Sequence, residues 1–267
     1  MNYTVLSRKW RPKTFEDVVG QSHITKILQN SIAQNKISHA YLFSGPRGVG
    51  KTTIARIMSC NLNEVDSINQ SIDIIELDGA SNRGIDEIRE IKESVRYAPS
   101  EGKYKIFIID ESHMLTKEAF NALLKTLEEP PSHVLFILAT TEYHKLPLTI
   151  VSRCQRYSFK RISVNVITSY LLDILKKEGF EVDEKALKAI AYKADGSLRD
   201  ALSLVDKVIT LADNNVISNT IIKNALGIID EEEYLNILKS VTNMDFKETL
   251  ETVENILNNG TSIINFM

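Results

Sequence analysis

The feature that most constrains this chain is the octapeptide from Gly45 to Thr52, which reads G-P-R-G-V-G-K-T. It follows an apolar run at Ala40–Ser44 and precedes a helical pattern that begins near Lys51. Glycines allow backbone N–H groups to converge on phosphate oxygens, and the helix N-terminus adds partial positive charge. A complete G-x-x-x-x-G-K-[ST] match between a strand and a helix predicts a nucleotide-binding phosphate loop.

The last residues of this loop have distinct predicted roles. Lys51 is expected to reach the β- and γ-phosphates of ATP, and Thr52 to place its hydroxyl on Mg²⁺. ATP and Mg²⁺ are therefore the expected cofactors. The cofactor-binding residues predicted from this segment are Gly45, Pro46, Arg47, Gly48, Val49, Gly50, Lys51, Thr52 and Thr53.

Apolar runs alternate with helical patterns through the first part of the chain. The runs are Ala40–Ser44, Ile72–Leu77, Lys105–Ile109 and His133–Ala139. Each is apolar along most of its length, as expected for strands of a parallel sheet that is covered on both faces. A fifth run, Gln155–Phe159, alternates polar and apolar residues, which suits an edge strand. This alternation predicts an α/β fold with a five-stranded, doubly wound parallel sheet.

The pattern changes after about Lys160, where no further strand run is evident and helical periodicity dominates. Three stretches are predicted to form a small all-α module, at Val164–Glu178, Glu184–Ala194 and Leu198–Leu211. From Gly227 a further helical region begins. We therefore expect an α/β domain at 1–162, a three-helix domain at 163–226 and an incomplete helical domain at 227–267.

Polar residues follow the third and fourth predicted strands. Asp110 and Glu111 come after four apolar residues, which places their carboxylates at the sheet edge where the phosphate loop lies. Asp110 is then the acid on the magnesium side, with Thr52, and Glu111 orients or deprotonates the attacking water. The alternative is a solvated acidic turn. A hydroxyl of Thr140 or Thr141 could hydrogen-bond the γ-phosphate or the water, or simply cap the strand.

Composition restricts the partners and the compartment. With a formal net charge of -3 in 267 residues, the chain has no strongly basic field, so any nucleic-acid contact must come from a local patch. Cys60 and Cys154 form no metal-ligand spacing, which fits a reducing cytosol. No apolar run reaches membrane-spanning length, and Met1–Trp10 lacks the apolar core of a signal peptide. We therefore expect a cytoplasmic protein without membrane contact.

Six further motifs are spread along the chain: Arg8-Lys9-Trp10-Arg11-Pro12, Phe15–Gln21, His39–Gly45, Asn121–Pro131, Ser152-Arg153-Cys154 and Gly196–Ser203. Together they resemble the gamma/tau family of bacterial DNA polymerase III subunits, over nearly the whole chain. The resemblance implies an AAA+ ATPase with a Rossmann-like domain, a three-helix lid and part of a helical collar. It implies that the polymerase holoenzyme, a transferase and DNA-directed DNA polymerase, uses this subunit as an ATPase and not as its polymerising part.

The resemblance also implies partners. The family works in a ring-like pentamer of gamma/tau copies with delta and delta-prime subunits, at the replisome on the bacterial nucleoid. ATP binding lets that assembly hold the sliding clamp open, and primed DNA triggers hydrolysis so that the clamp closes around the duplex. The chain is thus expected to be the motor that loads the clamp during DNA replication.

Three residues take catalytic roles by resemblance. Thr141 looks like the first sensor, and Arg199 like the second, which reaches from the lid to the γ-phosphate. Arg153 looks like an arginine finger directed at ATP in the neighbouring subunit, where such a finger contributes roughly 10³–10⁵ in rate. Taken alone, Arg153 could be a surface ion-pair arginine, and Arg199 a helix-start arginine paired with an aspartate at 195 or 200.

Two groups of binding residues are weaker predictions. The N-terminal segment is similar to the part of the family that encloses the adenine, where apolar and backbone contacts suit a flat base; an ordinary core-capping arm is the alternative. The adenine candidates are Arg11, Pro12, Val18 and Val19. Contacts to the DNA backbone would be independent of sequence. The candidates are Asn82, Arg83 and Thr149, with a plain helix cap as the alternative for Asn82.

The sequence departs from the family in two places. Most members carry a four-cysteine zinc module between the phosphate-loop helix and the second strand, whereas Asn61–Ser71 contains no cysteine. Because a tetrahedral site needs four ligands, no zinc is predicted. The stretch from Gly227 to Met267 is too short for the collar, which leaves pentamer formation by this chain open.

Two other functions remain as alternatives. A non-hydrolysing subunit of the delta-prime type would lack a working phosphate loop, yet Lys51, Thr52, Asp110 and Glu111 are all present. A Holliday-junction branch-migration helicase is a different AAA+ motor. The Ser-Arg-Cys finger and the Leu-Glu-Glu-Pro-Pro helix end argue against it.

Overall fold

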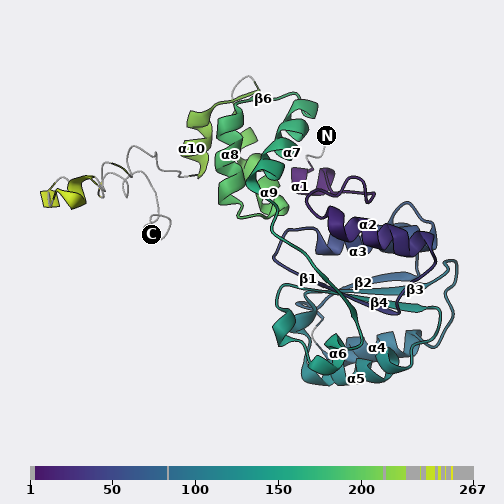
Figure 1. Ribbon diagram of the computed structural model, residues 1–267. Coiled ribbons are helices and arrows are strands. Elements are labelled where there is room, and N and C mark those ends of the chain that lie inside the picture. Colours follow the sequence, from purple (N-terminus) through teal and green to yellow (C-terminus); the bar gives the residue numbers. More distant parts are fainter. Residues whose placement is uncertain are drawn as a thin grey trace.

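The computed structural model of the chain describes residues 4–82, 84–212 and 215–226, together with 235, 239–243, 246–247, 250 and 254. A sheet layered between helices forms one part, and a bundle of helices stands at one end of it (Figure 1). The collar predicted at 227–267 falls almost entirely outside the described residues and stays a prediction. Within them, no helix is long and apolar enough to cross a lipid bilayer.

The predicted five-stranded parallel sheet is confirmed, with the strand order β2-β3-β4-β1-β5. Its strands are β1 Ala40–Ser44, β2 Ile74–Asp78, β3 Lys105–Asp110, β4 Val134–Thr140 and β5 Gln155–Ser158. The alternating β5 lies at one edge, as predicted. At the other edge β2 begins two residues later than expected, because Ile72 is exposed and pairs with no strand.

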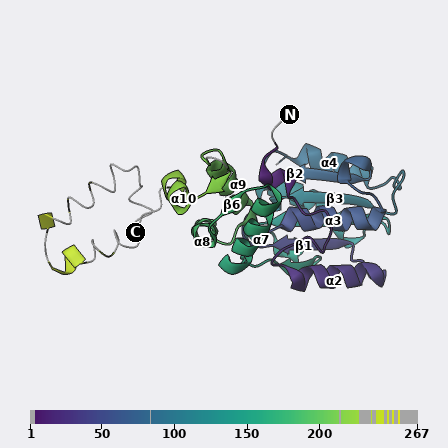
Figure 2. The same ribbon diagram turned by 90° about the horizontal axis from the view of Figure 1, so that it is seen from above.

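Helices cover both faces of this sheet (Figures 1 and 2). On one face lie α2 Ser22–Ala33 and α3 Lys51–Asn63, and on the other α4 Ile85–Ser94, α5 Lys117–Glu128 and α6 Leu148–Val151. Successive strand residues point to opposite faces, so Phe43 packs with Met58 of α3, while Leu42 packs with Ile88 of α4 and Phe120 of α5. The short 3₁₀ turns are η1 Ile68–Gln70, η2 Ser112–Met114 and η3 Tyr143–Lys145.

The three helices predicted after residue 163 are confirmed within two residues of their ends, as α7 Val164–Lys177, α8 Glu184–Lys193 and α9 Leu198–Ile209. Their apolar faces share a core with α10 Asn219–Leu226, a helix that the sequence reading missed. The expectation of no further strand was wrong, because β6 Glu181–Val182 pairs in parallel with β7 Val216–Ile217. Two-residue strands are too short to leave a periodic signal.

The N-terminal arm packs on this bundle. Leu6, in α1 Leu6–Lys9, is buried in the bundle core, and its backbone N–H donates to the carboxylate of Asp206 in α9. The indole N–H of Trp10 donates to Glu178 Oε1 at 2.7 Å, beside the ion pair of Lys9 with Glu178 Oε2. The arm therefore joins the helical bundle to the sheet, although the predicted domain of 1–162 groups it with the sheet alone. The three domain boundaries stay predictions.

Candidate functional site

The phosphate loop leaves β1 and enters α3 through left-handed backbone conformations. Gly45, Gly48 and Gly50 have φ angles of 152°, 71° and 103°, which L side chains rarely adopt. A Cβ on Gly45 would also lie 2.5 Å from the carbonyl oxygen of Phe159. The glycine positions in the motif are therefore required by the fold of the loop itself.

Lys51 is the best-buried cation of the site, with 6% of its surface exposed. Its Nζ donates to the carbonyl oxygens of Gly45 at 2.9 Å and Pro46 at 2.7 Å. Burial lowers its pKa below the ordinary 10.5, and the nearby carboxylates of Asp110 and Glu111 oppose that shift. A buried ammonium bonded only to neutral carbonyls fits an anion at the mouth of the loop, which is the position a polyphosphate takes in such a fold.

Thr52 and Asp110 meet as predicted for a magnesium site. The Thr52 hydroxyl donates to Asp110 Oδ2 at 2.6 Å. The described residues contain no cluster of three or more His, Cys, Asp or Glu that could hold a metal alone. Mg²⁺ in nucleotide sites needs only one or two carboxylates, together with phosphates and water, so a hydroxyl and a carboxylate in contact fit it.

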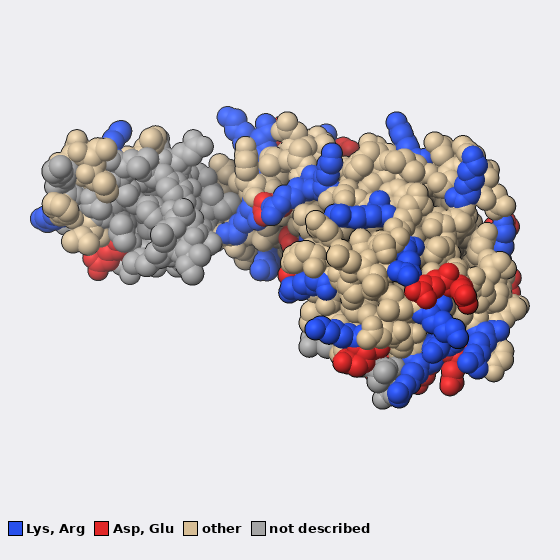
Figure 3. Space-filling view, turned by 60° about the horizontal axis from the view of Figure 1, so that its bottom comes forward, with Lys and Arg blue, Asp and Glu red and all other residues tan. Residues whose placement is uncertain are grey.

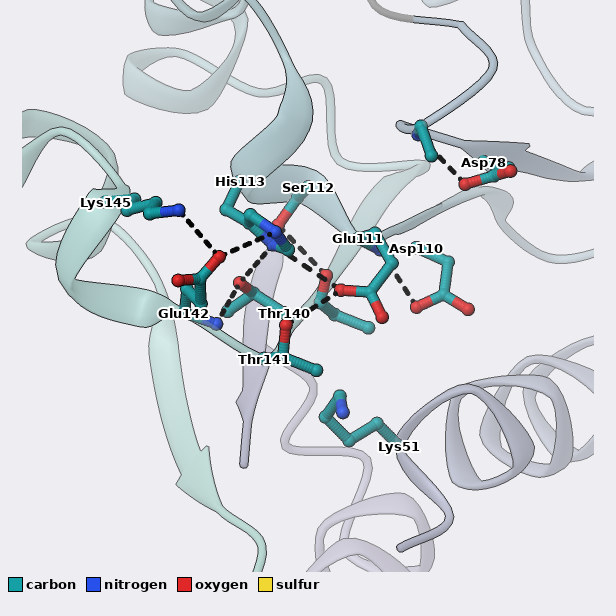
Figure 4. Close-up of polar contacts among 12 residues, drawn as sticks. Lys51, Asp78, Asp110, Glu111, Ser112, His113, Thr140, Thr141, Glu142 and Lys145 are labelled. Atoms are coloured by element: carbon teal, nitrogen blue, oxygen red, sulfur yellow. Dashed lines mark hydrogen bonds and ion pairs between the residues drawn. The ribbon is translucent and has the colours of Figure 1, made fainter. Parts of the chain in front are cut away.

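Glu111 has a φ of 44°, in the left-handed region that is uncommon for a residue with a side chain. The hydroxyl of Thr141, at the end of β4, donates to Glu111 Oε2 at 3.2 Å (Figure 4). Asp110 Oδ1 accepts the backbone N–H of Glu111 at 2.9 Å, which supports this turn. Backbone strain of this kind gathers at functional sites, and here it aims the carboxylate toward Thr141 and Lys51.

The helical bundle touches the phosphate loop directly. The backbone N–H groups of Leu198 and Arg199, at the start of α9, donate to the carbonyl oxygen of Gly48 at 3.1 and 3.4 Å. Ser197 lies so close that a Cβ on Gly48 would overlap its hydroxyl oxygen. The loop thus caps the first turn of α9, which ties the bundle to the residues that face the phosphates.

One pocket runs from this loop to the N-terminal arm. It is lined by all of Arg47–Thr53, by Asp110 and Glu111, and by residues of the arm and of α9. The lining residues outside the phosphate loop and the acidic pair are Ser7, Trp10, Arg11, Pro12, Val18, Val19, Ile162, Leu198, Arg199 and Leu202. The four adenine candidates and Arg199 therefore share a pocket with the phosphate loop, and the apolar side chains at its far end suit a base.

Arg11 and Arg199 add positive charge to this pocket. Burial lowers the pKa of Arg11, and repulsion from Arg56 and Arg199 adds to the effect, whereas Glu76 opposes it. Asp195, one of the partners considered for Arg199, instead forms an ion pair with Arg161. Like charges gathered at an anion-binding pocket are stabilised by a bound polyphosphate.

Arg153 does not line the pocket. Its guanidinium forms an ion pair with Glu128 at 2.5 Å and donates to the carbonyl oxygen of Thr149 at 2.7 Å. This is the surface ion pair that was the alternative to a finger. Its place outside the pocket of its own chain is compatible with action on a neighbour, and the finger role stays a prediction.

Two of the three DNA candidates, Asn82 and Thr149, lie in the described part of the chain, in different segments. Both the backbone N–H and the side-chain amide of Asn82 donate to the carbonyl oxygen of Asp78, and α4 starts later, after Gly84. Thr149 lies on α6 and is exposed. Arg83 lies outside the described residues. On the face drawn in Figure 3, basic side chains are interspersed with acidic ones and separated by uncharged areas.

Several site residues were missed by sequence reasoning. Trp10 lines the pocket beside the predicted Arg11, and Gly79 approaches the catalytic turn so closely that a Cβ would lie 2.8 Å from the Glu111 carbonyl oxygen. Gln21 is fully buried and pairs with both the N–H and the C=O of Lys160. His113 contacts Glu111. Trp10 and Gln21 lie within motifs that carry the family resemblance, and Gly79 comes two residues after the second predicted strand, whereas His113 left no signal of this kind.

Two family models match the chain. One, described as DNA polymerase III, delta subunit, matches residues 20–163. The other, described as DNA polymerase III clamp loader subunit, ATPase lid domain, matches residues 166–214. The two matches together span the sheet and most of the helical bundle.

Among solved structures, the RuvB Holliday junction branch migration motor of Thermotoga maritima superposes with a TM-score of 0.67. The two are 22% identical, over 88% of this chain and 80% of that one. At this identity the likeness shows the fold alone. It confirms the predicted AAA+ P-loop fold.

Curated relatives are more similar in sequence. The chain is 48% identical to DNA polymerase III subunit tau of Bacillus subtilis, over 97% of this chain and 49% of that protein. It is 44% identical to DNA polymerase III subunit tau of Escherichia coli, over 90% of this chain and 40% of that protein. It is 42% identical to DNA polymerase III subunit gamma of Buchnera aphidicola, over 97% of this chain and 76% of that protein.

The chain thus spans about half the length of the Bacillus subtilis relative. A classification of this chain itself as a transferase or a DNA-directed DNA polymerase finds no support in these matches. The same family is indicated by the family model of the lid domain and by the curated relatives, and the intact phosphate loop and the AAA+ fold are consistent with it. The chain therefore belongs to the gamma/tau family of bacterial DNA polymerase III subunits, as its motifs predicted.

Proposed function

We propose that this chain binds ATP with Mg²⁺ and hydrolyses it at the junction of the sheet and the helical bundle. The observation that carries the proposal is the joint placement of Lys51, the Thr52–Asp110 pair and Glu111 at one end of a single pocket, with Thr141 hydrogen-bonded to Glu111. Each group supplies what in-line phosphoryl transfer to water requires: a cation on the phosphates, metal ligands, and an oriented carboxylate.

In this proposal Lys51 binds the β- and γ-phosphates, and the backbone N–H groups of the loop from Arg47 to Gly50 surround them. Glu111 acts as the general base that accepts a proton from the attacking water, and the hydroxyl of Thr141 holds the carboxylate of Glu111 in place. When bound at Thr52 and Asp110, Mg²⁺ neutralises developing phosphate charge. Arg199 approaches the γ-phosphate from α9, and the arm and Val18–Val19 enclose the base.

We propose that ATP hydrolysis drives loading of the sliding clamp onto primed DNA in the bacterial cytoplasm. Membership in the gamma/tau family supports this, since subunits of that family are clamp-loader ATPases. The proposed partners are delta and delta-prime subunits, further copies of this chain, the clamp and primed DNA. DNA contacts through Asn82, Arg83 or Thr149 and the absence of zinc belong to the same proposal.

The test is ATP hydrolysis by the complete protein mixed with its delta and delta-prime subunits, with and without clamp and primed DNA. We expect strong stimulation only when clamp and primed DNA are both present, and its loss in Lys51→Ala. Hydrolysis that is indifferent to clamp and primer but responds to branched DNA would instead identify a branch-migration motor, the function of the structural neighbour.

The finger role of Arg153 needs a separate test, because it concerns a neighbouring subunit. An Arg153→Ala chain mixed with a Lys51→Ala chain should recover part of the hydrolysis, since hybrid interfaces join an intact loop with an intact finger. Mixed assemblies are verified by differently tagged chains. Verified mixed assemblies without recovery would show that Arg153 does not act on its neighbour.

A further inference from the structure

His113 stands at the centre of a hydrogen-bonding cluster behind the proposed catalytic carboxylate (Figure 4). It belongs to η2, two residues after Glu111, and only 7% of its side chain is exposed. Its Nε2 lies 3.1 Å from Glu142 Oε2, and its Nδ1 lies 3.1 Å from Thr140 Oγ1 and 3.4 Å from Glu111 Oε2. The imidazole therefore bridges two carboxylates that come from different strand ends.

The two oxygens of Glu111 have different surroundings. Oε2 accepts from the Thr141 hydroxyl and faces His113, whereas Oε1 has no hydrogen-bond partner among the described residues. A carboxylate that is anchored through one oxygen presents the other in a defined direction. That free oxygen is the one available to accept hydrogen from water.

His113 is itself fixed from behind. A carboxylate can only accept, so holding both carboxylates requires a hydrogen on each ring nitrogen, with Nε2–H donating to Glu142 and Nδ1–H directed at Glu111. Glu142 also accepts from the ammonium of Lys145 at 2.8 Å, and its backbone N–H donates to Thr140 Oγ1 at 3.0 Å. Lys145 is half-exposed at 53%. The cluster thus runs from the exposed turn η3 to Glu111 through a ring that is almost completely buried.

We propose that His113 is a positioning residue for Glu111, and that Glu142, supported by Lys145, holds the ring of His113 in place. The inference rests on the proposed ATPase function and deepens it. A misplaced general base costs up to about 10²-fold in rate without weakening substrate binding, because only the reacting geometry changes. The alternative is that His113 merely stabilises the η2 turn.

Two amide substitutions separate these roles. An asparagine side chain can place its amide nitrogen near the position of Nδ1, and a glutamine side chain near that of Nε2. His113→Asn therefore keeps the contact with Glu111 and loses the one with Glu142, and His113→Gln does the reverse. We expect kcat of the asparagine variant within about threefold of wild type, and that of the glutamine variant lower by about tenfold or more.

The KM for ATP should stay unchanged in both variants, since neither touches the phosphate loop. His133→Asn and His133→Gln serve as matched controls, because His133 is also partly buried and, within the described part of the chain, its ring pairs only with the carbonyl oxygen of Val95, away from the pocket. Thermal unfolding of each variant checks that it folds. A purely structural role would lower the unfolding temperatures of both His113 variants without separating their kcat values.

The link to Glu142 is tested by a double-mutant cycle. Glu142→Ala should lower kcat about threefold in the wild-type background and leave it unchanged in the His113→Asn background, where the contact is already absent. Histidines labelled with ¹⁵N give a readout that needs no catalysis: Glu142→Ala should shift the ring signals of His113 and leave those of His133 in place. An equal kcat effect in both backgrounds, or an unshifted His113, would overturn the link.

All assays use the complete protein with its delta and delta-prime subunits, clamp and primed DNA. If wild type hydrolyses ATP and the glutamine variant is as fast as the asparagine variant, the positioning role is wrong and the ATPase proposal stands. If wild type does not hydrolyse ATP, the proposed function is wrong and this inference falls with it.

Discussion

The two ends of the nucleotide pocket are built in different ways. At the phosphate end, Lys51, Thr52, Asp110 and Glu111 come from two short segments at the ends of β1 and β3, held by hydrogen bonds of 2.6–2.9 Å. At the base end, Trp10 and Pro12 come from the arm, and further lining comes from α9, from Val18–Val19 and from Ile162. The first end is preorganised by local backbone; the second exists only when distant segments pack together.

This contrast separates two kinds of control. A preorganised end can act on reaction rate, because its donors and acceptors already occupy their places. An end assembled from an arm and a bundle can act on affinity, because its geometry depends on how those parts pack. Substitutions at the phosphate end should therefore change kcat, and substitutions at the base end should change nucleotide affinity.

The largest effect is expected for Glu111→Gln. Removing the base should lower kcat by about 10²–10⁴-fold, while ATP binding stays near that of wild type. Trp10 is the only tryptophan of the chain and lines the base end, so its fluorescence reports binding while phosphate release reports hydrolysis. A parallel loss of binding would show that the two ends are not separable.

Gly48→Ala should break the contact between the two ends. The new Cβ would overlap Ser197 Oγ at a backbone φ of 71°, and overpacking of this kind costs about 1–3 kcal/mol of unfolding free energy. Gly179→Ala is the matched control, because its φ is 82° but nothing lies within 4 Å of the new Cβ. Denaturant unfolding measures both, and an equal loss in the two variants would assign the cost to backbone strain alone.

Lys51→Met should remove the free-energy cost of burying a cation at the phosphate end, and with it one source of the pH dependence of stability. Because burial lowers the pKa of Lys51 below 10.5, the folded chain gives up this proton before the unfolded chain does. Between the two pKa values the unfolded state binds more protons, so wild-type stability rises with pH relative to the methionine variant. Unfolding from pH 8 to 10.5 measures the difference, and a difference that does not change with pH would contradict the burial effect.

The smallest effect is expected for Glu178→Gln at the base end. The ion pair of Glu178 with Lys9 is partly solvated, so its loss should cost about 0.2–1 kcal/mol of unfolding free energy. ATP affinity should fall by about threefold and kcat stay constant, since the arm carries Trp10 into the pocket. Glu184→Gln, whose ion pair with Lys188 lies within α8, is the control. A change in kcat would contradict the division between the ends.

The same division explains what could be predicted from the sequence. The phosphate loop, Asp110 and Glu111 are read from contiguous residues, and parallel strands bring their C-terminal ends to one edge, so their meeting follows from the fold class. Thr140 and Thr141 were both candidates from their position after an apolar run, and the family resemblance favoured Thr141. Signals of this kind come from neighbouring residues, so they can be recognised in a single sequence.

What the sequence could not supply depends on contacts between distant segments. His113 pairs with Glu142 across two strand ends, and Gln21 pairs with Lys160 139 residues away. No spacing rule encodes such pairs. The short strands β6 and β7 are stabilised by each other and not by any pattern of their own, and α10 is held by the core it completes.

The pairing of Gln21 has a mechanical consequence. Its side-chain amide bonds both the N–H and the C=O of Lys160 to the sheet, while the next anchored amide, that of Ile162, donates to the carbonyl oxygen of Gly196 on the bundle side. Only Arg161 separates the two anchors. The covalent connection between sheet and bundle therefore leaves only the backbone of Arg161 between its two anchors, and a rotation of the bundle would also have to break the contacts of α9 with the phosphate loop and of the arm with α7 and α9.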